Sequence, residues 1–191
     1  MEYIKFKCNW EARMISEEIN LEEINNWTAY LKRELLLGVD DKGVGYGNVS
    51  IRQGKKSFLI TGTQTAKFPN LDREHYTMVE KYDFIANSVD CHGLTQASAE
   101  SLTHAIVYET NETINAVVHV HSVHIWEKYI NKLPTTRDVP YGTPEMAFAI
   151  QKLIKEKEGG SGLIIMSGHQ DGILAFGGTL KEAVLNILAL I

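Results

Sequence analysis

The sequence has few cysteines and lacks a long apolar run. Its two cysteines, Cys8 and Cys91, lie far apart in the 191 residues and form no CxxC pair. This spacing argues against a disulfide framework and against a cysteine-based zinc site. No apolar run approaches the roughly 18 residues that span a bilayer, and the opening segment lacks the apolar core of a signal peptide. We therefore expect a cytoplasmic protein with no membrane partner.

Clustered positive charge is also missing. The chain carries 19 Lys and Arg against 24 Asp and Glu, a net charge of −5. Nucleic-acid binding through broad phosphate neutralisation needs clustered cations, as does a polybasic membrane anchor, so neither partner is expected. Apolar residues make up 44% and charged residues 23% of the chain, which is typical of a globular protein. The length predicts one domain over residues 1–191.

Hydrophobic periodicity predicts helices that alternate with short strands. The predicted helices cover residues 20–37, with Asn20 and Glu23 as a capping box and Gly38 as the stop, then 97–110, 143–159 from a Thr143 cap, and a last helix from Thr179. The predicted strands cover residues 48–52, 57–61, 75–91, 115–123, 163–166 and 172–176, the first two as a hairpin. This order predicts a layered α/β domain with a mixed or largely antiparallel sheet.

Two histidines lie two residues apart in a predicted strand. His119 and His121 therefore point to one face, while Val118 and Val120 point to the other, toward a core. Two imidazoles on one face can hold a divalent cation. The alternative is that both are half-exposed strand residues with no special role.

A third histidine offers a further ligand from a different segment. His169 lies in a turn flanked by glycines, directly after a predicted strand. Asp171 is an alternative ligand, or an acceptor that orients an imidazole. His124 would face away from the first two histidines if the strand continued, so we expect a structural role for it.

An acidic residue opens the helix predicted at 97–110. Ser98 can cap this helix, which puts Glu100 in the first turn, where the helix dipole favours a carboxylate. A dipole role alone explains many such residues, whereas a carboxylate beside a metal would act as a general base. His104 lies one turn later and either orients Glu100 or packs in the core, and packing is favoured.

Two loops are rich in small residues, at 45–50 and 61–65. Such loops offer backbone N–H groups and hydroxyls to an anion. The alternative is that both are plain turns.

Taken in chain order, these segments resemble the class II aldolase/adducin family. The segments that match are Gly47-Asn48-Val49-Ser50, Thr61-Gly62-Thr63, Ser98-Ala99-Glu100, His119-Val120-His121, Gly142-Thr143-Pro144-Glu145, and His169 with Gly172. The resemblance runs from about residue 20 to the C-terminus. It implies a three-layer α/β/α sandwich around a largely antiparallel sheet, and a homotetramer with active sites near subunit boundaries.

The resemblance also implies roles for single residues. It puts the catalytic zinc on His119, His121 and His169, the catalytic carboxylate on Glu100, and the substrate-binding positions on Asn48, Gly62, Thr63 and Ser98. Imidazole sites also take other divalent first-row metals.

The sequence departs from the family pattern at several positions. Ala99 replaces a second serine, and Gln64 replaces a glycine, so both changes remove or obstruct a phosphate contact. His169 stands three positions before Gly172 rather than directly before a glycine. Tyr141 is a possible substitute for a catalytic tyrosine that some aldolases carry on a longer segment.

These residues predict a zinc-dependent aldolase-type lyase of carbohydrate metabolism. Its substrate would be a small hydroxy-carbonyl compound, sugar-like or sugar-phosphate-like, which reacts through a metal-stabilised enediolate while Glu100 moves the proton. An epimerase or a dehydratase would use the same metal site. A non-catalytic adducin-like interaction domain and a metal-dependent hydrolase are the alternatives from other classes.

Overall fold

The computed structural model describes residues 6–157 and 159–191. Within these residues, eight strands form one sheet in the order β1-β7-β6-β5-β4-β8-β10-β9. The strands are β1 (Lys7–Ala12), β4 (Asn48–Arg52), β5 (Phe58–Thr61), β6 (Tyr76–Asp83), β7 (Ser88–Gly93), β8 (Ala116–His121), β9 (Gly162–Ile165) and β10 (Gly172–Gly177). Neighbouring strands are antiparallel except β1 and β7. Two short strands, β2 (Gly38–Val39) and β3 (Gly45–Tyr46), pair separately.

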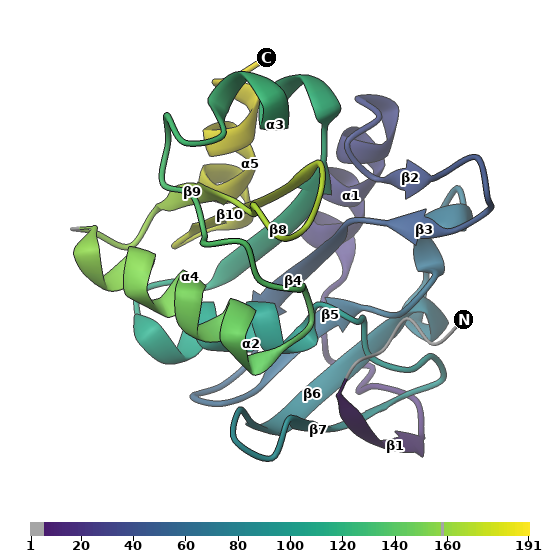
Figure 1. The fold of residues 1–191 in the computed structure, drawn as a ribbon. Helices are drawn as coiled ribbons and strands as arrows, with labels where there is room; N and C mark the ends of the chain where they lie inside the picture. The colour runs from purple at the N-terminus through teal and green to yellow at the C-terminus, as the bar shows by residue number, and fades with distance from the viewer. Residues whose placement is uncertain (1–5, 158) are drawn as a thin grey trace.

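Helices cover both faces of the sheet (Figure 1). Helices α2 (Ser101–Thr110) and α4 (Pro144–Glu156) pack on one face, while α1 (Glu22–Arg33), α3 (Val123–Tyr129) and α5 (Leu180–Leu188) pack on the other. Successive residues of β8 point to opposite faces of the sheet. Val117 packs in the core beneath α2 and α4, and Val118 packs in the core beneath α1, α3 and α5. This alternation follows from the two-residue period of a strand. The predicted three-layer α/β/α sandwich with a largely antiparallel sheet is confirmed.

Strand β8 lies in the sheet between β4 and β10. Its register puts His119 opposite Asn48 of β4 on one side and Leu174 of β10 on the other. His121 stands opposite Gly172, at the end of the strand. The two histidines therefore project from the face that carries α2, near one end of the sheet.

Several predicted elements are confirmed. Strands β4 and β5 form the expected hairpin. Thr143 caps α4 by accepting a hydrogen bond from the Met146 N–H at 3.4 Å, and Pro144 occupies the first helical position. Thr179 caps α5 in the same way, at 3.1 Å from the Glu182 nitrogen. Local cap chemistry was sufficient to locate both helix starts.

The helix predicted at 20–37 is wrong at both ends. It starts at Glu22 with Leu21 as the cap residue, and Asn20 instead accepts a hydrogen bond from the Glu22 N–H at 2.8 Å. It ends at Arg33, before Gly38, because Leu35 adopts a left-handed conformation with φ of 57°. Leu35 is 77% exposed, so it does not extend the apolar face on which Ile24 and Leu31 are buried.

Ser98 does not cap α2, which begins two residues later than this prediction requires. The Ser98 carbonyl accepts the Ser101 N–H in a turn, and Glu100 occupies the cap position rather than the first helical turn. The strand predicted at 115–123 is also too long. It ends at His121, and Ser122 caps α3, so His124 is exposed on a helix.

Some elements escaped the sequence patterns altogether, namely β1, the β2–β3 pair and α3. The segment 75–91 is a hairpin of two strands, β6 and β7, rather than continuous strand. Strand β1 brings Cys8 to within 3.6 Å of Cys91 on β7, Sγ to Sγ, and both are free thiols. Among the described residues, no helix is both long enough and apolar enough to cross a membrane.

Candidate active site

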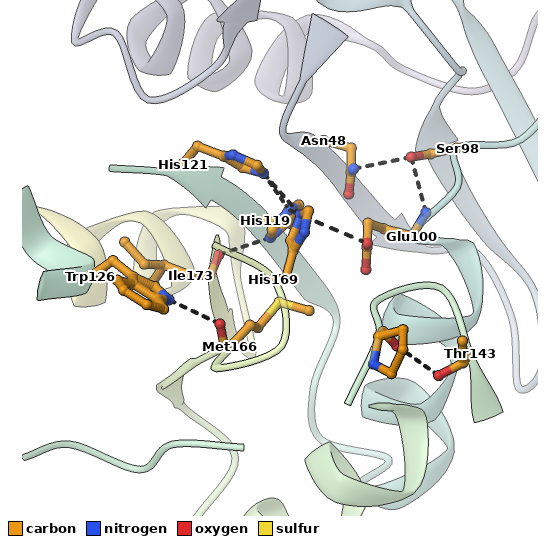
Figure 2. A network of polar contacts seen from close by, with 11 residues as sticks. Asn48, Ser98, Glu100, His119, His121, Trp126, Thr143, Met166, His169 and Ile173 are labelled. Carbon is orange, nitrogen blue, oxygen red and sulfur yellow. Dashed lines mark hydrogen bonds and ion pairs between the residues drawn. The ribbon is translucent and has the colours of Figure 1, made fainter. Parts of the chain in front are cut away.

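Three histidines from two segments converge on one point (Figure 2). His119 and His121 project from β8, and His169 projects from the loop between β9 and β10. The Nε2 atom of His121 lies 3.1 Å from that of His119 and 3.0 Å from that of His169. The third side of this triangle, His169 to His119, is 3.1 Å. The structure thus brings together all three histidines that the sequence singled out.

A tight turn positions His169. The Gly172 N–H donates to the His169 carbonyl at 2.8 Å, and Asp171 takes a positive φ of 64° between them, as in a type II turn. A Cβ atom on Gly172 would lie 2.6 Å from the His169 Cδ2 atom. The absence of a side chain at Gly172 therefore lets the His169 imidazole lie against the backbone of the turn.

Burial keeps the two strand histidines neutral. It lowers the pKa of His119 well below its ordinary value, and the nearby His121 and His169 lower it further. Burial also lowers the pKa of His121 to about 4. At neutral pH these imidazoles therefore offer lone pairs, which is the form that binds a metal.

The triangle of nitrogens fits a bound cation. A neutral imidazole nitrogen either donates or accepts, so among three mutually contacting Nε2 atoms at least one contact pairs like with like. A cation at the centre removes this conflict. Tetrahedral zinc, with Zn–N distances of about 2.0–2.1 Å, puts its ligand nitrogens about 3.3–3.4 Å apart, close to the separations of 3.0–3.1 Å seen here.

Asp171 is not part of this group. Among the described residues, the three histidines form the one set of histidine, cysteine or acidic side chains whose ligand atoms converge within 4.8 Å. The Asp171 carbonyl instead accepts the Ser122 N–H, which ties the turn to the start of α3. Burial and the nearby Glu127 raise the pKa of the Asp171 carboxyl.

A buried carboxylate stands beside the histidines. Glu100 is 3% exposed, and its Oε1 atom lies 4.0 Å from Nε2 of His169. It occupies the cap position of α2, so the helix that covers this face of the sheet also delivers the carboxylate. The carboxylate therefore lies directly beside the point on which the three imidazoles converge.

Asn48 and Ser98 form a second polar pair next to Glu100. The Asn48 amide nitrogen donates to Ser98 Oγ at 3.0 Å, and the same Oγ accepts the Glu100 N–H at 3.4 Å. The Asn48 Oδ1 atom is buried and has no hydrogen-bond partner among the described residues. An unsatisfied buried acceptor calls for an explanation, and a substrate hydroxyl would provide one.

All of these groups line one cavity of about 880 Å³. Gly62 and Thr63, the remaining predicted substrate-binding positions, line it as well. Their N–H groups are already used, since Gly62 donates to the His75 carbonyl and Thr63 to the Gln96 carbonyl. These two N–H groups therefore do not serve an anion, although the sequence raised that possibility.

Part of the cavity wall comes from the β2–β3 pair, which the sequence patterns did not predict, although they assigned residues 45–50 to a loop of small residues. The segment around β2 and β3 supplies several lining residues, among them Tyr46, whose ring lies 5.3 Å from that of His121. Tyr141 lines the cavity on another side, with its ring 4.1 Å from that of His169. The two-residue strands are too short to show a period. The sequence already points to Tyr141, as a substitute for the catalytic tyrosine of some aldolases.

His104 packs in the core. Its Nδ1 atom lies 2.7 Å from Ser50 Oγ, which also contacts the Tyr108 hydroxyl at 2.7 Å. Complete burial lowers the pKa of His104 to about 3. The packing interpretation fits these contacts, because the hydrogen-bonded nitrogen faces Ser50 rather than Glu100.

The chain has recognisable relatives. Residues 40–191 match the family described as Class II Aldolase and Adducin N-terminal domain. No curated protein matches the sequence. Among solved structures, an L-fuculose 1-phosphate aldolase is similar with a TM-score of 0.69 and 22% identity, over 92% of this chain and 82% of the other.

Two further structures share the fold. A sugar-phosphate aldolase from Thermotoga maritima has a TM-score of 0.67 and 16% identity, over 89% of each chain. An aldolase II superfamily protein from Pseudomonas syringae has a TM-score of 0.59 and 15% identity, over 92% of this chain and 74% of the other. With the family match over residues 40–191, the protein belongs to the class II aldolase and adducin N-terminal domain family.

Proposed function

We propose that the protein is a zinc-dependent, aldolase-type lyase that cleaves a C–C bond in a small hydroxy-carbonyl compound. The observation that carries this proposal is the triangle of Nε2 atoms, 3.0–3.1 Å apart, with the Glu100 carboxylate 4.0 Å from His169 in the same cavity. Three imidazole ligands leave open positions on a metal, as a catalytic site needs. A scaffold without catalysis has no need for this arrangement.

Each residue has a distinct role in the proposed reaction. A divalent cation held by the three histidines would supply a Lewis acid that stabilises negative charge developing on the substrate oxygens. Glu100 accepts the proton of the substrate hydroxyl at a carboxylate oxygen, and the same carboxylate returns a proton to the carbon from which the bond has broken. Its burial excludes water, which would otherwise compete for that proton.

The substrate-binding positions orient the reacting carbon atoms. Asn48 offers its buried Oδ1 to a substrate hydroxyl, and Ser98 holds the Asn48 amide in place. Thr63 contributes its side-chain hydroxyl, since its N–H is committed to Gln96. Gly62 keeps this wall close to the neighbouring segment, because a Cβ there would lie 2.5 Å from Thr95 Cγ2.

The similar structures support a lyase over a hydrolase, because two of the names describe aldolases of sugar phosphates. The all-imidazole ligand set supports zinc, although other first-row metals bind such sites. The homotetramer implied by the family resemblance is part of the same proposal.

The test is a cleavage assay on zinc-loaded protein with a panel of hydroxy-carbonyl compounds, scored by the aldehyde or ketone released. Glu100→Gln should lower kcat on the best substrate by about 100-fold or more at unchanged zinc content. Glu156→Gln, an exposed glutamate at the end of α4, is the matched control and should leave kcat unchanged. Cleavage that survives Glu100→Gln or a chelator would overturn the proposal, and an epimerised rather than cleaved product would assign the site to an epimerase.

A further inference from the structure

We propose that this cavity accepts an uncharged hydroxy-carbonyl substrate and rejects its phosphorylated counterpart, and that Gln64 determines this preference. The inference rests on the proposed function because it concerns the same cavity. It adds the charge class of the substrate and a residue with a role in specificity.

Gln64 adopts an unusual backbone conformation in the wall of the cavity. It follows β5 with φ of 58° and ψ of 20°, the left-handed region that residues other than glycine, asparagine and aspartate rarely occupy. The side chain reaches across to β3, where its Oε1 atom accepts the Gly45 N–H at 2.8 Å. Strain of this kind persists where the surrounding structure enforces it, and it is concentrated at binding sites.

The hydrogen bond between Gln64 and Gly45 removes a donor from the cavity. A phosphate group bound by a small-residue loop depends on several backbone N–H groups. Here the Gly45 N–H is taken by Gln64, and the Thr65 N–H and hydroxyl both donate to the Gly62 carbonyl. With the N–H groups of Gly62 and Thr63 also committed, four backbone donors of this wall bind oxygens of the protein rather than an anion.

The hydrogen-bonding group that Gln64 still offers suits an uncharged substrate. Its Oε1 atom is engaged by Gly45, so the donor that the side chain still offers is the amide nitrogen. A neutral amide donates well to a substrate hydroxyl and carries no charge to balance a phosphate. Gln64 thus occupies the Gly45 N–H and offers its own amide N–H in place of it, which favours a substrate hydroxyl at this position.

The charge of the cavity wall acts in the same direction. The ionisable lining residues other than histidine and tyrosine are four carboxylates, Glu34, Asp40, Glu100 and Asp171, and one cation, Lys42. The formal sum is 1 − 4 = −3, and a bound divalent cation brings it only to −1. A phosphate dianion would enter against this field, whereas an uncharged compound would not.

The first experiment measures inorganic phosphate binding to metal-free protein by isothermal titration at pH 8 and constant ionic strength. Wild type should show no saturable binding at about 10 mM phosphate, which corresponds to a Kd weaker than the millimolar range. Gln64→Gly frees the Gly45 N–H and relieves the strained conformation, so it should bind phosphate at least about tenfold more tightly than wild type. Gln64→Glu keeps an acceptor for Gly45 and adds a negative charge, so it should not gain binding.

A second variant keeps the test valid if Gln64→Gly fails to fold. The Asp40 Oδ1 atom accepts the N–H groups of Lys42 and Val44, at 2.9 and 2.8 Å, and an asparagine can keep both bonds. Asp40→Asn therefore removes one negative charge with little structural change, and should strengthen phosphate binding about two- to fivefold. Submillimolar phosphate binding by wild type would overturn the inference, as would equal binding by wild type and both of these variants.

The second experiment uses a matched pair, dihydroxyacetone and its phosphate ester, with zinc-loaded protein. Wild type should bind the uncharged compound at least as tightly as the ester, and Gln64→Gly should shift this ratio toward the ester by about tenfold. A wild-type preference for the ester would overturn the inference. If neither compound binds while wild type also rejects inorganic phosphate, the exclusion of phosphate stands, and it is the proposed hydroxy-carbonyl activity that fails.

Discussion

The Nδ1 atom of His119 lies 3.2 Å from the carbonyl oxygen of Ile173 on the neighbouring strand. A carbonyl only accepts, so Nδ1 carries the proton of the neutral ring, and Nε2 presents its lone pair to the other two imidazoles. Backbone pairing between β8 and β10 thus determines which nitrogen faces the cavity. A fixed tautomer of this kind is typical of histidines that bind metals.

His119→Asn should distinguish the roles of the two nitrogens of this ring. The asparagine amide nitrogen lies near the position of Nδ1 and can keep the bond to Ile173, but no atom replaces Nε2. The unfolding free energy of the metal-free protein should therefore change by no more than about 1 kcal/mol. Metal affinity should fall by more than about 100-fold, because one ligand is lost. Urea denaturation and competition with a chromogenic chelator measure the two quantities, and unchanged metal affinity would contradict this role for His119.

Gly172→Ala should weaken metal binding, although Gly172 is not a ligand and lies at the end of the turn that begins at His169. The added Cβ would lie 2.6 Å from His169 Cδ2, so the imidazole must move. We expect metal affinity to fall by about tenfold or more. Gly178→Ala is the control, because its Cβ would have no neighbour closer than 3.3 Å. Equal metal affinity for both variants, measured by the same chelator competition, would show that the turn does not position His169.

Two substitutions of Tyr141 should distinguish its hydroxyl from its ring. The ring packs 4.1 Å from that of His169, and Tyr141→Phe preserves this contact. If the hydroxyl takes part in proton transfer, Tyr141→Phe should lower kcat by about 100-fold with metal content unchanged. Tyr141→Ala should in addition weaken metal binding by about tenfold, because the ring that supports His169 is lost. A Tyr141→Phe enzyme with full kcat would restrict Tyr141 to packing.

His104 should make the protein less stable as the pH falls. Its pKa is lowered by burial to about 3 in the folded state, whereas an unfolded histidine has a pKa of about 6.5. The unfolded chain therefore takes up the proton first, and the stability contribution is complete above pH 6.5 and is lost as the pH falls toward 3. Between these values the loss is about 1.4 kcal/mol for each pH unit.

His104→Gln removes this proton uptake. Urea denaturation of metal-free protein at pH 7.5 and pH 5 should show a smaller loss of unfolding free energy for the variant than for wild type. The burial of His119 and His121 is common to both proteins. Because His104 also lowers the pKa of His119, its replacement reduces the pH dependence further in the same direction. Parallel pH profiles would contradict the buried, neutral state of His104.

The sequence predicts the centre of the site better than its rim. His119 and His121 follow from the two-residue period of a strand, and helices that begin with a Thr cap were located correctly. Both rely on local chemistry. By contrast, α2 starts after a turn that Ser98 forms with its own carbonyl, and a Ser-x-Glu pattern does not distinguish such a turn from a helix cap.

The rim of the cavity depends on contacts between residues that lie far apart in the chain. Gln64 reaches Gly45 across two loops, and its left-handed conformation is unexpected for a glutamine. Leu35 ends a helix in the same conformation, against an apolar pattern that continues past it. At both positions tertiary contacts override local propensity, so periodicity alone could not reveal them.

The most direct test of the account is metal content, measured by elemental analysis of untagged protein after zinc is supplied and excess is removed. Wild type and the control His124→Ala, whose histidine is exposed on α3, should each retain close to one zinc per chain. His119→Ala and His169→Ala should each lose it. Wild type without bound metal, or full zinc retention in both of these site variants, would contradict the three-histidine centre and with it the proposed lyase.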